Sequence, residues 1–228
     1  MIAIMGSLSD TILANTYLTL KRITVEPMVF IFFLALSMTG SAGQLMYIAK
    51  VCNHLNYTKD ICANLEKPEN QLERTDVQDE VSKLQTISTV IGFLPASLST
   101  LLLCNAADII GRKPVMLISV LGYSLHSLNF LINWVFRNGS AYYLLFENIH
   151  ALFGGETSIT IGYVLYISDI TSIHNRTFRL TVVGVLNLIG KGVGVYASGL
   201  FMNLIGFYGT FGIGVALVIF VASISRFL

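Results

Sequence analysis

Charged residues are scarce in this chain of 228 residues, where Asp, Glu, Lys and Arg together make up 12% of the total. Soluble domains carry about 25% charged residues and use them to form a hydrated surface. Apolar residues make up 54% of the chain. This composition excludes an ordinary soluble domain, and it predicts that the lipid bilayer covers much of the protein surface.

Other functional classes are disfavoured by what the sequence lacks. The 14 basic and 13 acidic residues give a net charge of +1, which provides no basic surface for nucleic acid. The three cysteines do not make a disulfide scaffold, and no spacing of His and Cys typical of a metal site occurs. The sequence has no GxSxG, HExxH or Gly-rich phosphate loop. We therefore expect a protein that is not an enzyme and that holds no cofactor or metal.

What the sequence does contain is six apolar stretches, each close to the ~20 residues that cross a bilayer as a helix. They lie at about 27–48, 84–104, 114–136, 141–167, 178–204 and 208–227. Residues 1–23 are mixed in character and are predicted to form a tail. The predicted fold is thus an all-α membrane protein with a tail at 1–23 and a six-span unit at 24–228.

The basic residues of the short connections gather on one side of this six-span arrangement. On that side lie Lys21, Arg22, Arg112, Lys113, Arg176, Arg179 and Arg226. Because short cytosolic connections are enriched in Lys and Arg, we predict that the tail and both termini are cytosolic. The long connection 49–83 holds seven of the 13 acidic residues and is then an extracytosolic loop.

The extracytosolic segments contain sites for covalent modification. Sequons for N-glycosylation at Asn56 and Asn138 lie outside, whereas the sequon at Asn175 lies inside and would be unused. Cys52 and Cys62 face an oxidising compartment. Three states are open to these cysteines: they pair with each other, one pairs with a cysteine elsewhere in a longer protein, or both are free thiols.

Four ionisable side chains within the predicted spans are candidates for function. A charge at bilayer depth costs about 2.5–3.5 kcal/mol on insertion scales and is rarely kept without a role. Glu156 and Lys191 lie at similar depth in two antiparallel spans, where they exchange a proton, are separated by an anionic substrate, or form a static ion pair. Glu147 and His150 lie one turn apart nearer the outer end; they line an outer vestibule, or His150 is simply a hydrogen-bonded helix residue.

The connection between the second and third spans contains an acid that topology does not explain. Gly111 suits a tight turn, and Arg112 with Lys113 anchors the inner face. Asp108, however, lies at the C-terminal end of a helix, where its charge opposes the helix dipole. Asp169 poses the same problem at the inner end of the fourth span. Arg112 is a candidate partner for both acids, which would form a cytosolic charge cluster.

This connection resembles the loop motif of the major facilitator superfamily, Gly-x-x-x-Asp-basic-x-Gly-basic-basic. The matching residues are Asp108, Gly111, Arg112 and Lys113. Cys104 stands where the first Gly is expected, and Ile109 stands where a basic residue is expected. The resemblance implies that the six spans form one half of a major facilitator superfamily fold and that this motif, with Asp169, belongs to a gating loop.

Within that superfamily the chain is similar to solute carrier family 46, the group that contains the proton-coupled folate transporter. The similarity is carried by Val25-Glu26-Pro27, by Cys52 with Asn56-Tyr57-Thr58 and Cys62, by Ser168-Asp169-Ile170-Thr171, and by Arg176-Thr177-Phe178-Arg179. It implies twelve spans in two halves, and this chain resembles the N-terminal half.

One departure from the family bears on mechanism. Where the resemblance places a proton-coupling Glu on the fifth span, this chain has Gly184. Lys191 follows two helical turns later, on about the same face. Glu156 does occupy the place of a functional acid on the fourth span. The resemblance therefore supports Glu156 as a site residue and leaves the family scheme of proton coupling open for this chain.

The combined prediction is a secondary transporter in the plasma membrane or the lysosomal membrane. It would carry a small organic solute of anionic character, with or without protons, and a C-terminal half or a second chain would complete the transport path. The alternative is a truncated, non-transporting half that binds a partner or is only a fragment.

Overall fold

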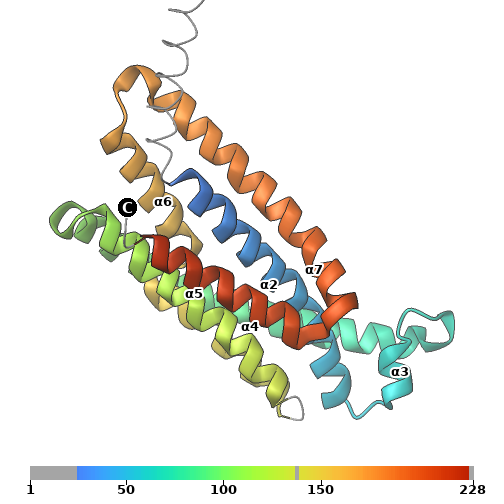
Figure 1. Ribbon diagram of the computed structural model, residues 1–228. Coiled ribbons are helices and arrows are strands. Elements are labelled where there is room, and N and C mark those ends of the chain that lie inside the picture. The colour runs from blue at the N-terminus through green and yellow to red at the C-terminus, as the bar shows by residue number, and fades with distance from the viewer. Residues whose placement is uncertain (1–24, 137–138, 226–228) are drawn as a thin grey trace, which may run out of the picture.

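Every regular element in the described part of the chain is a helix. The computed structural model describes residues 25–136 and 139–225, so the predicted tail and the sequon at Asn138 lie outside the described residues. The α-helices are α2 (Glu26–His54), α3 (Lys59–Ala63), α4 (Gln71–Ile110), α5 (Arg112–Val135), α6 (Gly155–Ile170) and α7 (Ile173–Ser225), and the 3-10 helices are η1 (Pro68–Asn70) and η2 (Ala141–Phe153) (Figure 1).

Four helices in the described ranges are long and apolar enough to cross a membrane. They are α2, the segment Pro68–Ile110 that contains α4, α5 and α7. The prediction of an all-helical membrane protein is confirmed at this level. The predicted fourth span, 141–167, is divided between η2 and α6, and the predicted fifth and sixth spans both lie within α7. That the chain crosses the membrane six times remains a prediction.

The helical element α7 is interrupted at Gly206. This residue has φ 66° and ψ −167°, a conformation that glycine adopts without the steric penalty of a side chain. Figure 1 shows the chain turning back at the end of the orange arm and continuing as the red arm. The predicted stretches 178–204 and 208–227 lie on either side of this interruption.

Helical structure extends into the connection predicted at 49–83. α2 continues to His54, and α4 begins at Gln71, well before the apolar stretch that starts near residue 84. The residues from 71 to 83 include Glu, Arg, Gln and Lys, which favour helix in water. Hydropathy finds the part of a helix that suits lipid, and it does not report polar turns that continue the same helix.

α2 is the central helix of the bundle. It packs against both α7 and α5, and its buried residues contribute to two hydrophobic clusters. One cluster includes Phe32, Phe33, Tyr123, Ile159 and Val218; the other includes Met46, Tyr47, Phe130, Leu144 and Phe211. α4, in contrast, leaves many of its apolar side chains exposed, among them Leu98, Leu101 and Leu102. The face that carries α4 is therefore open to lipid or to further protein.

Small residues allow α7 to lie close against α2. A Cβ atom added to Gly190 would lie 2.7 Å from the carbonyl oxygen of Phe30, and one added to Gly194 would collide with the carbonyl oxygen of Leu34. Both obstacles are backbone atoms, which cannot turn aside as a side chain can. In a membrane, where close packing replaces the hydrophobic effect as the force between helices, such contacts hold a bundle together.

We expect Gly194→Ala to destabilise the bundle by about 1–3 kcal/mol, because the added methyl group overpacks the contact between α7 and α2. Gly192→Ala is the matched control, since a Cβ atom at that position on the same helix meets nothing within 4 Å. Thermal unfolding of the two variants in detergent checks this, with a melting temperature several degrees lower expected for Gly194→Ala alone. Equal melting temperatures would contradict the close packing.

Candidate functional site

Glu156 and Lys191 form an ion pair between α6 and α7. Lys191 Nζ lies 2.7 Å from Glu156 Oε1 and 5.0 Å from the ring centroid of Phe33 on α2, a cation–π distance. The side chains of Lys191 and Glu156 are 41% and 42% exposed within this chain. The sequence analysis placed the two charges at bilayer depth, and within the described chain the structure leaves the pair on an open face of the bundle.

The pair lies next to a break in the helical backbone. η2 ends at Phe153, Gly154 and Gly155 have φ values of 87° and 58°, and α6 begins with Glu156 in its first turn. Glu156 is thus at a helix N-terminus, where the helix dipole stabilises a carboxylate. The sequence analysis placed Glu156 within a continuous span, 141–167, because it did not detect this break.

Hydroxyl groups from neighbouring helices satisfy the backbone around the break. Thr100 Oγ1 donates to the carbonyl oxygen of Gly154 at 2.9 Å, and Ser119 Oγ donates to the carbonyl oxygen of Phe153 at 2.9 Å. Ser158 Oγ in turn donates to Thr100 Oγ1 at 3.1 Å. Irregular backbone of this kind is tolerated at membrane depth where protein groups replace the lost helical hydrogen bonds.

Glu147 accepts hydrogen bonds from two other helices. Its Oε1 accepts from the Tyr47 hydroxyl at 2.6 Å and from Ser88 Oγ at 2.9 Å, so it joins α2 and α4 to η2. Asn148 Nδ2 also donates to Ser88 Oγ, at 2.7 Å. Glu147 therefore lies in a polar network between α2, α4 and η2, and its place in an outer vestibule stays a prediction.

His150 lies against a second histidine that the sequence analysis did not single out as a site residue. His126 Nδ1 and His150 Nδ1 lie 3.0 Å and 2.8 Å from the backbone carbonyl oxygen of Glu147. The two imidazole rings are 4.7 Å apart, and the ring of Tyr123 is also 4.7 Å from that of His150. Spacing alone could not find this pair, because the two histidines come from different helices.

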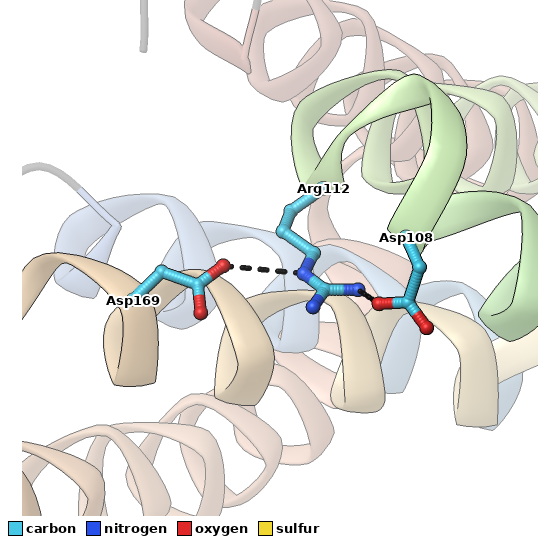
Figure 2. A network of polar contacts seen from close by, with 3 residues as sticks. All are labelled: Asp108, Arg112 and Asp169. Atoms are coloured by element: carbon cyan, nitrogen blue, oxygen red, sulfur yellow. Dashed lines mark hydrogen bonds and ion pairs between the residues drawn. The ribbon is translucent and has the colours of Figure 1, made fainter.

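Arg112, just beyond the C-terminal end of α4, joins two acids as the sequence predicted. Arg112 Nη1 lies 2.5 Å from Asp108 Oδ1, and Arg112 Nε lies 3.2 Å from Asp169 Oδ2. Figure 2 shows the guanidinium group between the two carboxylates, which come from the end of α4 and the end of α6. Gly111, at φ 96°, makes the turn, and Lys113 lies 5.9 Å over the ring of Tyr166. We call this end of the bundle the Arg112 end.

The Arg112 end holds a second ion pair, which was not predicted from the sequence. Arg179 Nη2 lies 2.6 Å from Glu26 Oε1, and Arg179 Nη1 donates to Thr171 Oγ1 at 3.1 Å. The side chains of Arg179 and Glu26 are 16% and 8% exposed. Both residues occur in the strings that carry the family resemblance, but the two strings lie far apart in the sequence. Only the packing of α2 against α7 brings the pair together.

The opposite end carries a disulfide. The structure joins Cys52, on α2, to Cys62, on α3, which is the first of the three states left open above. Asn56, whose sequon was predicted to be extracytosolic, lies in the turn between them and has φ 58°. We call this end of the bundle the disulfide end. In the described residues no group of three His, Cys, Asp or Glu side chains is arranged to hold a metal ion.

Comparison with known proteins found distant relatives. Over 200 residues, or 84% of this chain, the sequence is 25% identical to the lysosomal proton-coupled steroid conjugate and bile acid symporter of Homo sapiens, of which the match covers 43%. Over 172 residues, or 74% of this chain, it is 24% identical to the proton-coupled folate transporter of Rattus norvegicus, of which it covers 37%. No protein-family model matches the chain.

This chain is distantly similar to solute carriers. The similarity extends over most of the chain, and both named relatives come from the family that the sequence motifs indicated. The chain spans less than half of the length of the curated relatives that it matches. The comparisons therefore support a relationship between this chain and the solute carriers.

Proposed function

We propose that this protein takes part in secondary transport of a small organic anion across a membrane, coupled to protons, and that the Glu156–Lys191 pair is where the anion and the proton meet. The observation that carries the proposal is an ion pair of 2.7 Å, open on one side, at a break between helical segments of a membrane protein. Transporter sites are typically built at such discontinuities, where helix ends and charged side chains converge.

The pair offers a direct way to couple a proton to an anion. With Glu156 ionised, Lys191 is held by the carboxylate. When Glu156 takes up a proton, its attraction for Lys191 falls, and the ammonium group becomes available to an anionic solute. One proton and one monovalent anion would then bind together, so no net charge is added to the site. The relatives named above are proton-coupled, which agrees with this scheme.

A second helical unit is needed for alternating access. Transporters of this kind move a solute by rocking two units around a central site, and here one side of the pair is open. We propose that the open face, to which Glu156 and Lys191 contribute, is covered by a further set of helices. A continuation of the polypeptide or a second chain would serve.

The proton would reach the Glu156–Lys191 pair through a polar network on the side of the pair that faces the disulfide end. The titratable groups in that network are Tyr47 on α2, Tyr123 and His126 on α5, Glu147 and His150 on η2, Glu156 on α6 and Lys191 on α7. This network would take the place of the acid that the family resemblance expects at Gly184.

The orientation follows from the same assignment. We propose that the Arg112 end is cytosolic, that the disulfide end faces the outside or the lysosomal lumen, and that Asn56 carries a glycan. In this orientation protons enter from the acidic side and meet the histidines first.

Uptake measured across a pH series tests the proposal. We expect cells expressing the protein to take up a labelled steroid sulfate, bile acid or folate faster at about pH 5.5 than at about pH 7.5, because a higher proton concentration outside drives proton-coupled uptake. His150→Phe should flatten this pH dependence. His54→Phe is the control, since His54 lies edge-on against Tyr142 outside the network. Uptake independent of pH in the unmodified protein, or equal effects of both variants, would overturn proton coupling.

A further inference from the structure

A second cationic site lies at the disulfide end. A cavity of about 590 Å³ there is lined by Lys50, Asn53, Tyr57, Lys59 and Trp134, among others. No acidic residue is among the described residues that line it. Ser37 on α2 lies at the level of the Glu156–Lys191 pair, because its hydroxyl donates to the Lys191 carbonyl oxygen. Lys50 lies about 20 Å further along α2 than Ser37, at a rise of about 1.5 Å per residue.

Lys50 is an unusually buried cation. The residue is 3% exposed, and its Nζ donates to Asn133 Oδ1 at 2.9 Å and to the carbonyl oxygen of Phe136 at 3.5 Å. Both acceptors are neutral. Among residues 25–136 and 139–225, no carboxylate forms an ion pair with Lys50. A buried charge that is not neutralised is costly, so an anion held nearby would lower the free energy of this end of the bundle.

The remaining walls can hold such an anion together with an apolar body. Lys59 is exposed and provides a second ammonium group, and Asn53 provides an amide. The hydroxyl of Tyr57 is already used, since it donates to Asp76 at 3.0 Å. Trp134 offers an indole surface and packs against Phe207, with ring centroids 4.1 Å apart.

The disulfide fixes this arrangement. Cys62 also lines the cavity, and its bond to Cys52 closes the short loop that carries Lys59 against the end of α2. The position of Lys59 relative to Lys50 is therefore held by a covalent link as well as by packing.

We propose that this cavity binds an organic oxyanion, a sulfate, carboxylate or phosphate on an apolar body, with Lys59 and Asn53 at the anionic group, Lys50 as a fixed charge beneath it and Trp134 against the apolar part. The site is distinct from the Glu156–Lys191 pair, and its occupation does not depend on transport. The anion is either a free solute or the headgroup of an anionic lipid.

Trp134 is the only tryptophan of the chain, so its fluorescence reports directly on the cavity. Purified protein in a neutral detergent is titrated with pregnenolone sulfate and, separately, with uncharged pregnenolone. We expect a saturable change in Trp134 emission with the sulfate only. Lys59→Gln should weaken the apparent affinity about tenfold, the loss expected for one hydrogen bond to a charged group. Lys83→Gln is the matched control, since Lys83 is exposed, pairs with Glu80 and does not line the cavity.

A second arm distinguishes the source of the anion. Nanodiscs of phosphatidylcholine are compared with nanodiscs that also contain phosphatidylglycerol, without added solute. A Lys59-dependent change in emission with phosphatidylglycerol alone assigns the site to a lipid headgroup, and a change with pregnenolone sulfate assigns it to a free solute. No change in either arm, equal responses to pregnenolone and its sulfate, or an equal loss in Lys83→Gln overturns the proposal.

Discussion

Glu156→Gln and Lys191→Met are each expected to reduce uptake at least about tenfold while leaving surface abundance nearly unchanged. A buried ion pair that loses one partner costs about 3–5 kcal/mol of stability, but this pair is about two-fifths exposed within the chain. The cost to folding should then be closer to the ~0–1 kcal/mol of an exposed pair. A large loss of transport with little loss of protein is the result that separates function from folding here.

A matched control exists on the same chain. Glu80 and Lys83 form an ion pair of 3.1 Å on α4, and neither residue belongs to the Glu156–Lys191 pair or lines the cavity at the disulfide end. Glu80→Gln removes the same charge as Glu156→Gln and should leave uptake unchanged. If Glu80→Gln reduced uptake as much as Glu156→Gln, the effect would come from overall charge or expression and not from the central pair.

Arg112→Ala is expected to reduce uptake about tenfold or more, with surface abundance little changed. Its guanidinium group links the end of α4, through Asp108, to the end of α6, through Asp169 (Figure 2). Removal of Arg112 leaves two acids at helix C-termini without the cation that they share in the described chain, a position that the helix dipole disfavours. We expect the loss of Arg112 to destabilise the conformation of the transport cycle in which the ends of α4 and α6 are joined. Uptake normalised to surface-labelled protein measures this.

Two further variants define what Arg112 does. Arg112→Lys keeps the charge but lacks the forked donors that reach two carboxylates at once, so it should recover only part of the uptake. Lys113→Ala removes the neighbouring charge, which lies over Tyr166 and forms no ion pair with either acid within the described residues. This variant should retain most of the uptake. Normal uptake by Arg112→Ala would show that the Asp108–Arg112–Asp169 cluster serves only to fix the membrane topology.

Local physical rules predicted several contacts that the structure contains. The Asp108–Arg112–Asp169 cluster followed from two acids placed against helix dipoles with one arginine between them. The Glu156–Lys191 contact followed from two opposite charges at similar depth in antiparallel spans. The all-helical membrane fold followed from apolar stretches of spanning length. In each case, the energetic cost of an isolated charge or of exposed apolar surface limited the possible arrangements.

Other features depend on contacts that no local pattern reports. The break at Gly154 is stabilised by hydroxyl groups from α4 and α5, so the sequence of the span itself does not reveal it. The His126–His150 pair and the contact of Lys50 with Asn133 join different helices. Lys50 lies at the end of a predicted apolar stretch, where a lysine is ordinarily assumed to be in water. The structure buries it against α5.

The measurement that tests the central claim most directly is uptake by the double variant Glu156→Gln with Lys191→Met, normalised to surface abundance and taken across the pH series. No unpaired charge remains in this variant, so it should fold and reach the surface as the unmodified protein does. The account predicts that it nevertheless shows no proton-coupled uptake, because nothing at the break in the helix can carry a proton or meet an anion. Full, pH-dependent uptake by the double variant would show that Glu156 and Lys191 serve structure alone.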